Sequence, residues 1–230
     1  MTTVAVLAPH PDDETLGAGG TLLRHRSQGD EVHWVIATHM PDDDRFPAAA
    51  RAARDREIDL VAGRYGFAGV HQLGFEATHL DEVPHGEIVA ALAVVFREIG
   101  PDIVYLPHGG DVHTEHRIMC EAGLACTKWF RFPSVRRVLA YETLSETEFG
   151  GLPYMAAFTA NVFVDVGAHL EEKVAIAQLY GSEIGEHPFP RSLAAIRAQA
   201  TLRGAMAGVT AAEAFMLLRD VVSDQPRRRI

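Results

Sequence analysis

Short runs of apolar residues alternate with longer segments of helical periodicity through the first half of the chain. The run from Val4 to Ala8 is almost continuously apolar and is followed by Pro9, which is typical of a strand buried on both faces. Further strands are predicted at 31–38, 69–74 and 103–106, with helices at 15–28, 48–65 and 87–99. This alternation predicts an α/β fold, a Rossmann-like and mostly parallel sheet flanked by helices.

The pattern changes after Trp129. Strands are predicted at 135–141 and 161–166, followed by three helical stretches. We expect the last helix to begin at a capping box formed by Thr210 and Glu213, ahead of an apolar face made by Ala214, Leu217, Leu218 and Val221. The chain is thus expected to form a single domain over 1–230: a core with the chemistry in 1–130, walls and C-terminal helices in 131–223, and a solvated tail in 224–230.

Composition and charge narrow the class of protein. A chain of 230 residues buries roughly 70% of its unfolded surface, so it needs no disulfide or metal merely to fold. Its formal net charge of −10 disfavours nucleic acid as a partner. The N-terminus lacks the basic segment of a signal peptide, no apolar stretch is long enough to span a membrane, and the two cysteines have no redox or zinc-site spacing. These features predict a cytoplasmic protein with no membrane partner.

Two clusters rich in histidine and carboxylates follow two of the predicted strands. The first is His10-Pro11-Asp12-Asp13-Glu14, and the second runs from Pro107 to His116. In open parallel sheets, ligands bind in the crevice beyond the carboxyl ends of the strands. We therefore expect the two clusters to face one crevice.

The spacing within each cluster suits a metal ion. His10 and Asp13 are three residues apart, as are His113 and His116, which places each pair on one side of a turn. Two histidines and one carboxylate with open positions suit catalytic zinc and equally ferrous iron, either of which brings the pKa of bound water to roughly 7. Asp12, beside Asp13, is then the natural general base. The spacing leaves open which of His113 and His116 is the ligand.

Simpler interpretations exist for each residue alone. A loop histidine is commonly solvated, and Asp12, Asp13 or Asp111 would make ordinary helix N-caps. The occurrence of two such clusters at two strand ends favours the metal site. No Gly-x-Gly-x-x-Gly directly follows the first strand, and no Gly-x-Ser-x-Gly elbow occurs. A dinucleotide oxidoreductase and a covalent acyl-enzyme are therefore disfavoured, and a metal hydrolase is favoured.

Two segments carry a family resemblance. The segments APHPDDETLGAGGTL at 8–22 and DVHTEH at 111–116 resemble the LmbE-like (PIG-L) family of zinc-dependent N-acetyl-sugar deacetylases. The similarity extends over nearly the whole chain, through Arg54-x-x-Glu57, PDIVYLPH at 101–108, YETLSETE from Tyr141 and AEAF at 212–215.

The resemblance implies a role for each matching residue. It implies that His10, Asp13 and His116 hold zinc, that Asp12 is the general base, and that His113 stabilises the tetrahedral intermediate or protonates the leaving amine. Arg54 and Asp111 are assigned to substrate binding. The family has Asp between the two histidines, whereas this chain has Glu115, which puts the contact that orients His113 in question. Asp111 is the alternative orienting group.

The sequence thus predicts a zinc-dependent hydrolase that removes an N-acetyl group from an amino sugar or a sugar-bearing intermediate. The substrate is a small N-acylated sugar, and homo-oligomers occur in the resembled family. One alternative is hydrolysis of another amide, such as a thiol conjugate or an antibiotic glycoside. The other is a non-catalytic domain that binds metal or sugar, against which the intact Asp12 argues. Substrate choice is expected in the loops at 41–47 and 142–153, with His187 at the pocket rim.

Overall fold

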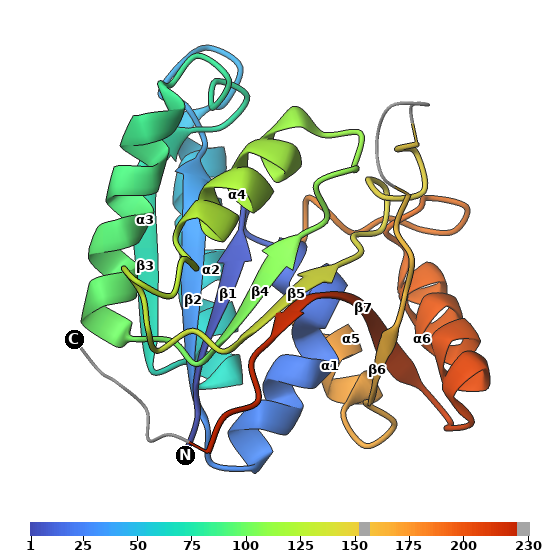
Figure 1. Cartoon of the computed structure of the whole chain (residues 1–230). Helices are drawn as coiled ribbons and strands as arrows, with labels where there is room; N and C mark the ends of the chain where they lie inside the picture. Colours follow the sequence, from blue (N-terminus) through green and yellow to red (C-terminus); the bar gives the residue numbers. More distant parts are fainter. Residues whose placement is uncertain (152–156, 225–230) are drawn as a thin grey trace.

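A computed structural model describes residues 1–151 and 157–224 (Figure 1). The end of the predicted tail, 225–230, and positions 152–153 of the predicted substrate loop lie outside these ranges. The elements follow in the order β1 (Thr3–Ala8), α1 (Asp13–Ser27), β2 (Glu31–His39), α2 (Ala48–Tyr65), β3 (Gly69–Glu76), α3 (His85–Ile99), β4 (Ile103–Pro107), α4 (Thr114–Ala125), β5 (Arg137–Tyr141), β6 (Val162–Asp165), α5 (Leu170–Ala177), α6 (Leu193–Ala207) and β7 (Ala212–Asp220). None of the helices described is both long and apolar enough to cross a bilayer.

The strands form one sheet in the order β3-β2-β1-β4-β5-β7-β6 (Figure 1). Strands β1 to β5 are parallel, and β7 runs antiparallel to both β5 and β6. The chain builds outward from β1 to β3 on one side and then returns to place β4 on the other side of β1. The strand order therefore reverses between β1 and β4, and the predicted mostly parallel α/β architecture is confirmed.

Helices cover both faces of the sheet, which explains the continuous apolar run in β1. Ala5 and Leu7 pack with apolar side chains of α3 and α4, whereas Val4, Val6 and Ala8 pack with those of α1 and α2. Alternate residues of a strand point to opposite faces, so a strand covered on both sides has no polar face. The carboxyl ends of the strands remain open for a site.

The predicted last helix is wrong: the residues Ala212–Asp220 form strand β7 instead. Glu213 makes no capping box. Its carboxylate accepts hydrogen bonds from the backbone N–H groups of Gly20 and Thr21, at 2.8 and 2.7 Å, and from Lys173 Nζ at 2.7 Å. The first four residues of β7 are buried, so their apolar pattern does not distinguish a strand from a helix. Pairing with β5 and β6, distant in sequence, decides the conformation.

Candidate metal centre

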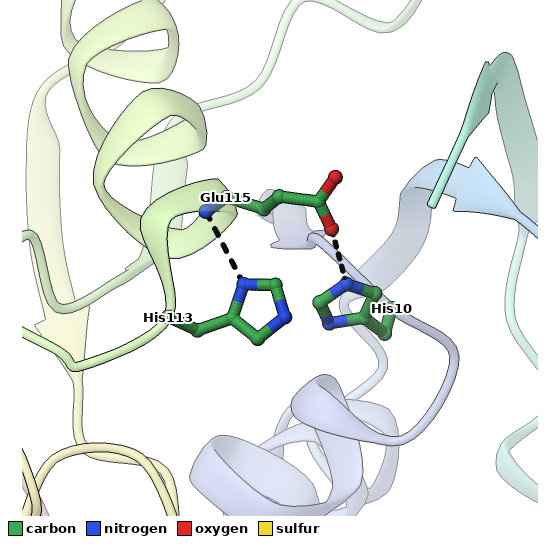
Figure 2. A group of neighbouring side chains, drawn as sticks. All are labelled: His10, His113 and Glu115. Carbon is green, nitrogen blue, oxygen red and sulfur yellow. Dashed lines mark hydrogen bonds and ion pairs between the residues drawn. The ribbon is translucent and has the colours of Figure 1, made fainter. Parts of the chain in front are cut away.

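The two predicted clusters meet at the point where the strand order reverses. The β1–α1 loop carries His10 and Asp12, the β4–α4 loop carries Asp111 and His113, and β1 pairs directly with β4. Figure 2 shows side chains from the two segments turned toward one another. A cavity of about 580 Å³ opens here, lined in part by His10, Asp12, Asp13 and His113. The expected crevice at the carboxyl ends of the strands is thus present.

One group of side chains at this point has the donors of a metal site. The ligand atoms of His10, Asp13 and His116 all lie within 4.8 Å of one another. His116 Nε2 is 3.3 Å from Asp13 Oδ1, and His10 Nδ1 is 3.4 Å from Asp13 Oδ2. His116 Nε2 is buried and has no hydrogen-bond partner among the described residues. A buried polar atom left unpaired costs about 1–3 kcal/mol, and an ion bound between these three residues would satisfy it.

A second group, His10, His113 and Glu115, also brings its ligand atoms within 4.8 Å. These atoms already interact within the protein (Figure 2). Glu115 Oε2 is 2.6 Å from His10 Nε2, and the Glu115 backbone N–H donates to His113 Nδ1 at 3.3 Å. The first group is therefore the better candidate for a metal.

Carboxylates lie behind both histidines of the first group. Asp111 Oδ2 is 2.8 Å from His116 Nδ1, and Glu115 contacts His10 Nε2. Each contact leaves the other ring nitrogen, His116 Nε2 or His10 Nδ1, for an ion, and such carboxylate–histidine pairs orient metal ligands. Asp111 is 1% exposed and lies behind His116, and its expected place in substrate binding stays a prediction. The carboxylates of Asp111 and Glu115 hold His116 and His10 instead of orienting His113.

The charges of the group are mutually dependent. Burial opposes charge on His10, but hydrogen bonds to Asp13 and Glu115 outweigh it and raise the pKa of His10 to about 9. Burial likewise opposes charge on His116, whose pKa rises to about 10 because of Asp13 and Asp111. The pKa of Asp13 is lowered, against the effect of burial, by these two histidines. The carboxylates therefore create a field that favours a cation at this point.

His113 is placed differently from His116. It is the N-cap of α4, where its Nδ1 accepts the Glu115 backbone N–H. The proton of the neutral ring then lies on Nε2. Burial and the neighbouring His10 and His116 lower the pKa of His113 to about 4. His113 is thus a neutral hydrogen-bond donor at the cavity wall.

Asp12 occupies the N-cap position of α1 but makes no capping hydrogen bond with its side chain. Its backbone φ is 145°, a conformation that costs a residue other than glycine about 1–3 kcal/mol. Thr15 and Leu16 hold this conformation by donating their backbone N–H groups to the Asp12 carbonyl. Burial, followed by the charge of Asp13, raises the pKa of Asp12 well above its usual value. The ordinary capping interpretation does not apply to Asp12, whose carboxyl group is available to exchange a proton.

Three further charged residues belong to the site. Arg54, assigned to substrate binding from the sequence, lines the cavity, and its Nη1 donates to the Pro11 carbonyl at 3.0 Å. Arg191 and Glu183, neither of which the sequence singled out, also line it and form an ion pair at 3.2 Å. No motif marks these two residues, and only the fold brings them to the centre. His187, expected at the rim, lines a separate depression.

Known proteins resemble this chain in sequence and in fold. The family profile PIG-L, described as GlcNAc-PI de-N-acetylase, matches residues 5–127. A diacetylchitobiose deacetylase from Thermococcus kodakarensis is 26% identical over 91% of this chain and 80% of its own length. A 1D-myo-inositol 2-acetamido-2-deoxy-alpha-D-glucopyranoside deacetylase from Streptomyces griseus is 30% identical, over 46% of this chain and 42% of its own. The crystal structure of a conserved protein from Thermus thermophilus superposes with a TM-score of 0.77 and 25% identity, covering 99% of this chain and 100% of that one.

Proposed function

This chain belongs to the PIG-L family, and we propose that it is a zinc-dependent hydrolase that removes the N-acetyl group of an amino sugar. One observation carries the proposal. The buried Nε2 of His116, which has no hydrogen-bond partner in the part of the chain that the structure describes, lies beside Asp13 and His10, with Asp12 adjacent to them. Two nitrogens and a carboxylate form the donor set of a catalytic zinc or ferrous site with open positions. His10, Asp13 and His116 would hold the ion.

The residues around the ion would each carry out a different part of amide hydrolysis. When bound, the metal polarises the amide carbonyl and lowers the pKa of water. Asp12 takes the proton from the attacking water and delivers it to the amine nitrogen as the carbon–nitrogen bond breaks. His113 donates a hydrogen bond from Nε2 to the carbonyl oxygen as negative charge develops there. Two backbone hydrogen bonds to the Asp12 carbonyl fix the main chain of this residue before substrate binds.

The substrate is a small N-acylated sugar. The cavity volume of about 580 Å³ falls in the range that accommodates a drug-sized ligand. Phe46, from the loop at 41–47, and Glu146, from the loop at 142–153, contribute to its lining. The names of the relatives favour acetylated amino sugars, whereas a thiol conjugate or an antibiotic glycoside is the competing amide substrate. A cytoplasmic location and a homo-oligomer stay predictions.

Two substitutions test the proposal. The enzyme is loaded with zinc, and acetate release is measured from N-acetylglucosamine and N,N′-diacetylchitobiose. Asp12→Asn should retain zinc and lower kcat by about 10²–10⁴-fold, because the base is lost while the ligands remain. His116→Ala should lose zinc, measured by elemental analysis. Asp59→Asn, on the exposed side of α2, is the matched control and should behave as wild type.

Three results would reject parts of the proposal. Near-normal turnover by Asp12→Asn would show that Asp12 is not the general base. Undiminished zinc in His116→Ala would show that His116 is not a metal ligand. A wild-type protein that retains zinc but hydrolyses no N-acylated sugar favours the non-catalytic binding domain.

A further inference from the structure

Arg191 lies immediately before the entry to α6, and its guanidinium reaches the metal centre. Its Nη1 is 3.6 Å from Asp12 Oδ2, and its Nη2 is 3.2 Å from Glu183 Oε2. The guanidinium also lies over the ring of Phe189, 5.6 Å from the centroid. A carboxylate and an aromatic ring therefore hold Arg191 in place while it faces Asp12.

The Asp12 carboxylate has few other partners. Asp12 is only 4% exposed, and within 1–151 and 157–224 its two carboxylate oxygens accept no hydrogen bond. Its backbone N–H donates to Glu14 Oε2 at 3.2 Å, which fixes the main chain and leaves the side-chain torsions free. Among the residues that the structure describes, Arg191 is the ion-pair partner of the Asp12 carboxylate. The direction of this carboxylate thus depends on Arg191.

Glu183 connects Arg191 to a second arginine that fixes the main chain before Asp12. Arg54 forms an ion pair with Glu183 and donates to the Pro11 carbonyl at 3.0 Å. The Arg54 side chain is 8% exposed, so packing sets its position. One shared glutamate therefore joins the arginine that holds the peptide before Asp12 to the arginine that faces its carboxylate.

We propose that Arg191 is a positioning residue for Asp12: it holds the carboxylate in the direction from which it accepts the proton of the attacking water. This inference rests on the proposed function, in which Asp12 is the base. A guanidinium suits the task because it is planar and permanently charged. Displacing a catalytic group by 1 Å costs about 10²-fold in rate, which sets the size of the expected effect.

Kinetics of Arg191→Met and Arg191→Lys test the proposal on the zinc-loaded enzyme with N,N′-diacetylchitobiose. Arg191→Met should lower kcat by about 10–100-fold, with KM changed by less than about 3-fold and zinc content unchanged. Arg191→Lys should recover part of kcat, because it restores a cation. Arg197→Met is the matched control: this arginine, in α6, forms an exposed ion pair with Glu171 and should be dispensable.

A crystal structure of zinc-loaded Arg191→Met gives a second measurement that needs no turnover. The Asp12 side chain should leave the direction it has in the wild type. An unmoved Asp12 carboxylate, wild-type kcat, or a raised KM at unchanged kcat would each overturn the positioning role. A wild-type enzyme inactive on every N-acylated sugar would instead contradict the proposed function, and the position of Asp12 in the variant crystal would still decide the role of Arg191.

Discussion

In the candidate metal group, which is made of His10, Asp13 and His116, each histidine uses its two ring nitrogens for different purposes. His116 Nδ1 lies against Asp111 and His10 Nε2 against Glu115, so that the nitrogens facing Asp13 remain for an ion. Carboxylates in such positions fix the ring orientation and raise the basicity of the ligand. The side chain of Glu115 reaches from α4 to His10 with one carboxylate oxygen. Its other oxygen accepts the Leu80 backbone N–H at 3.1 Å, so the longer glutamate serves two contacts at once.

Glu115→Asp tests whether this reach matters. The shorter side chain cannot satisfy both His10 and the Leu80 N–H, so zinc affinity should fall by about 10-fold or more. The contact to His113 should survive, because it comes from the backbone of residue 115. Competition with a chromophoric chelator measures the affinity. Glu121→Asp, exposed on the same helix, is the control; equal zinc affinity in both variants would show that the carboxylate contact to His10 is dispensable.

The sequence identifies those site residues whose chemistry is local. His10, Asp12 and Asp13 lie in one short segment of the sequence, and His113 and His116 lie in another, so spacing alone predicts that the members of each segment act together. Asp111, in the loop before α4, contacts His116 Nδ1 at 2.8 Å, and no periodic spacing indicates that contact. Arg191 reaches Asp12 across 179 positions of sequence, so that only the folded chain reveals the pair.

Among the elements, α1 is closely packed: its residues from Asp13 to Leu23 are all buried. Its glycines let the helix pass close to its neighbours: a Cβ at Gly20 would lie 2.7 Å from Val166 Cβ. The backbone N–H of Gly20 also donates to the Glu213 carboxylate. The contact with Val166 and the hydrogen bond to Glu213 therefore join the helix that begins at the candidate metal centre to the C-terminal part of the sheet.

Gly20→Ala should destabilise the protein by about 1–3 kcal/mol, because a buried β-branched side chain cannot move away from the added methyl group. Gly63→Ala in α2 is the matched control. A Cβ there meets nothing within 4 Å, so the helix propensity of alanine should stabilise the protein by about 0.5–1 kcal/mol. Urea denaturation measures both variants. Equal effects at the two positions would contradict the packing explanation.

The element predictions succeed where the pattern is unambiguous and fail where tertiary contacts decide. Strand β1 and helix α2 are close to the segments expected from periodicity and from the residues that end them. The sequence predicts a helix in place of strand β7 because the apolar spacing of 214–221 fits both periods and Thr210 with Glu213 has the form of a capping box. The ion-pair partner of Glu213 is buried Lys173, which no local rule indicates.

In the molecule as a whole, the apolar core and the candidate metal group occupy different places. The largest apolar clusters fill the two faces of the sheet, whereas His10 and His116 lie beyond the ends of β1 and β4. A chain of 230 residues buries enough apolar surface to fold by itself. The metal should therefore stabilise a structure that already exists.

Removing the metal tests this separation. The chelated protein should keep its far-ultraviolet circular dichroism spectrum and unfold cooperatively. Free zinc at 100 times its Kd should add about 2.7 kcal/mol of stability, or about 5–10 °C in Tm for a domain of this size. His116→Ala should lose that increase, whereas His85→Ala, exposed at the start of α3, should keep it. An unfolded apo protein would show that the fold depends on the ion, and an equal Tm rise in His116→Ala would place zinc at another site.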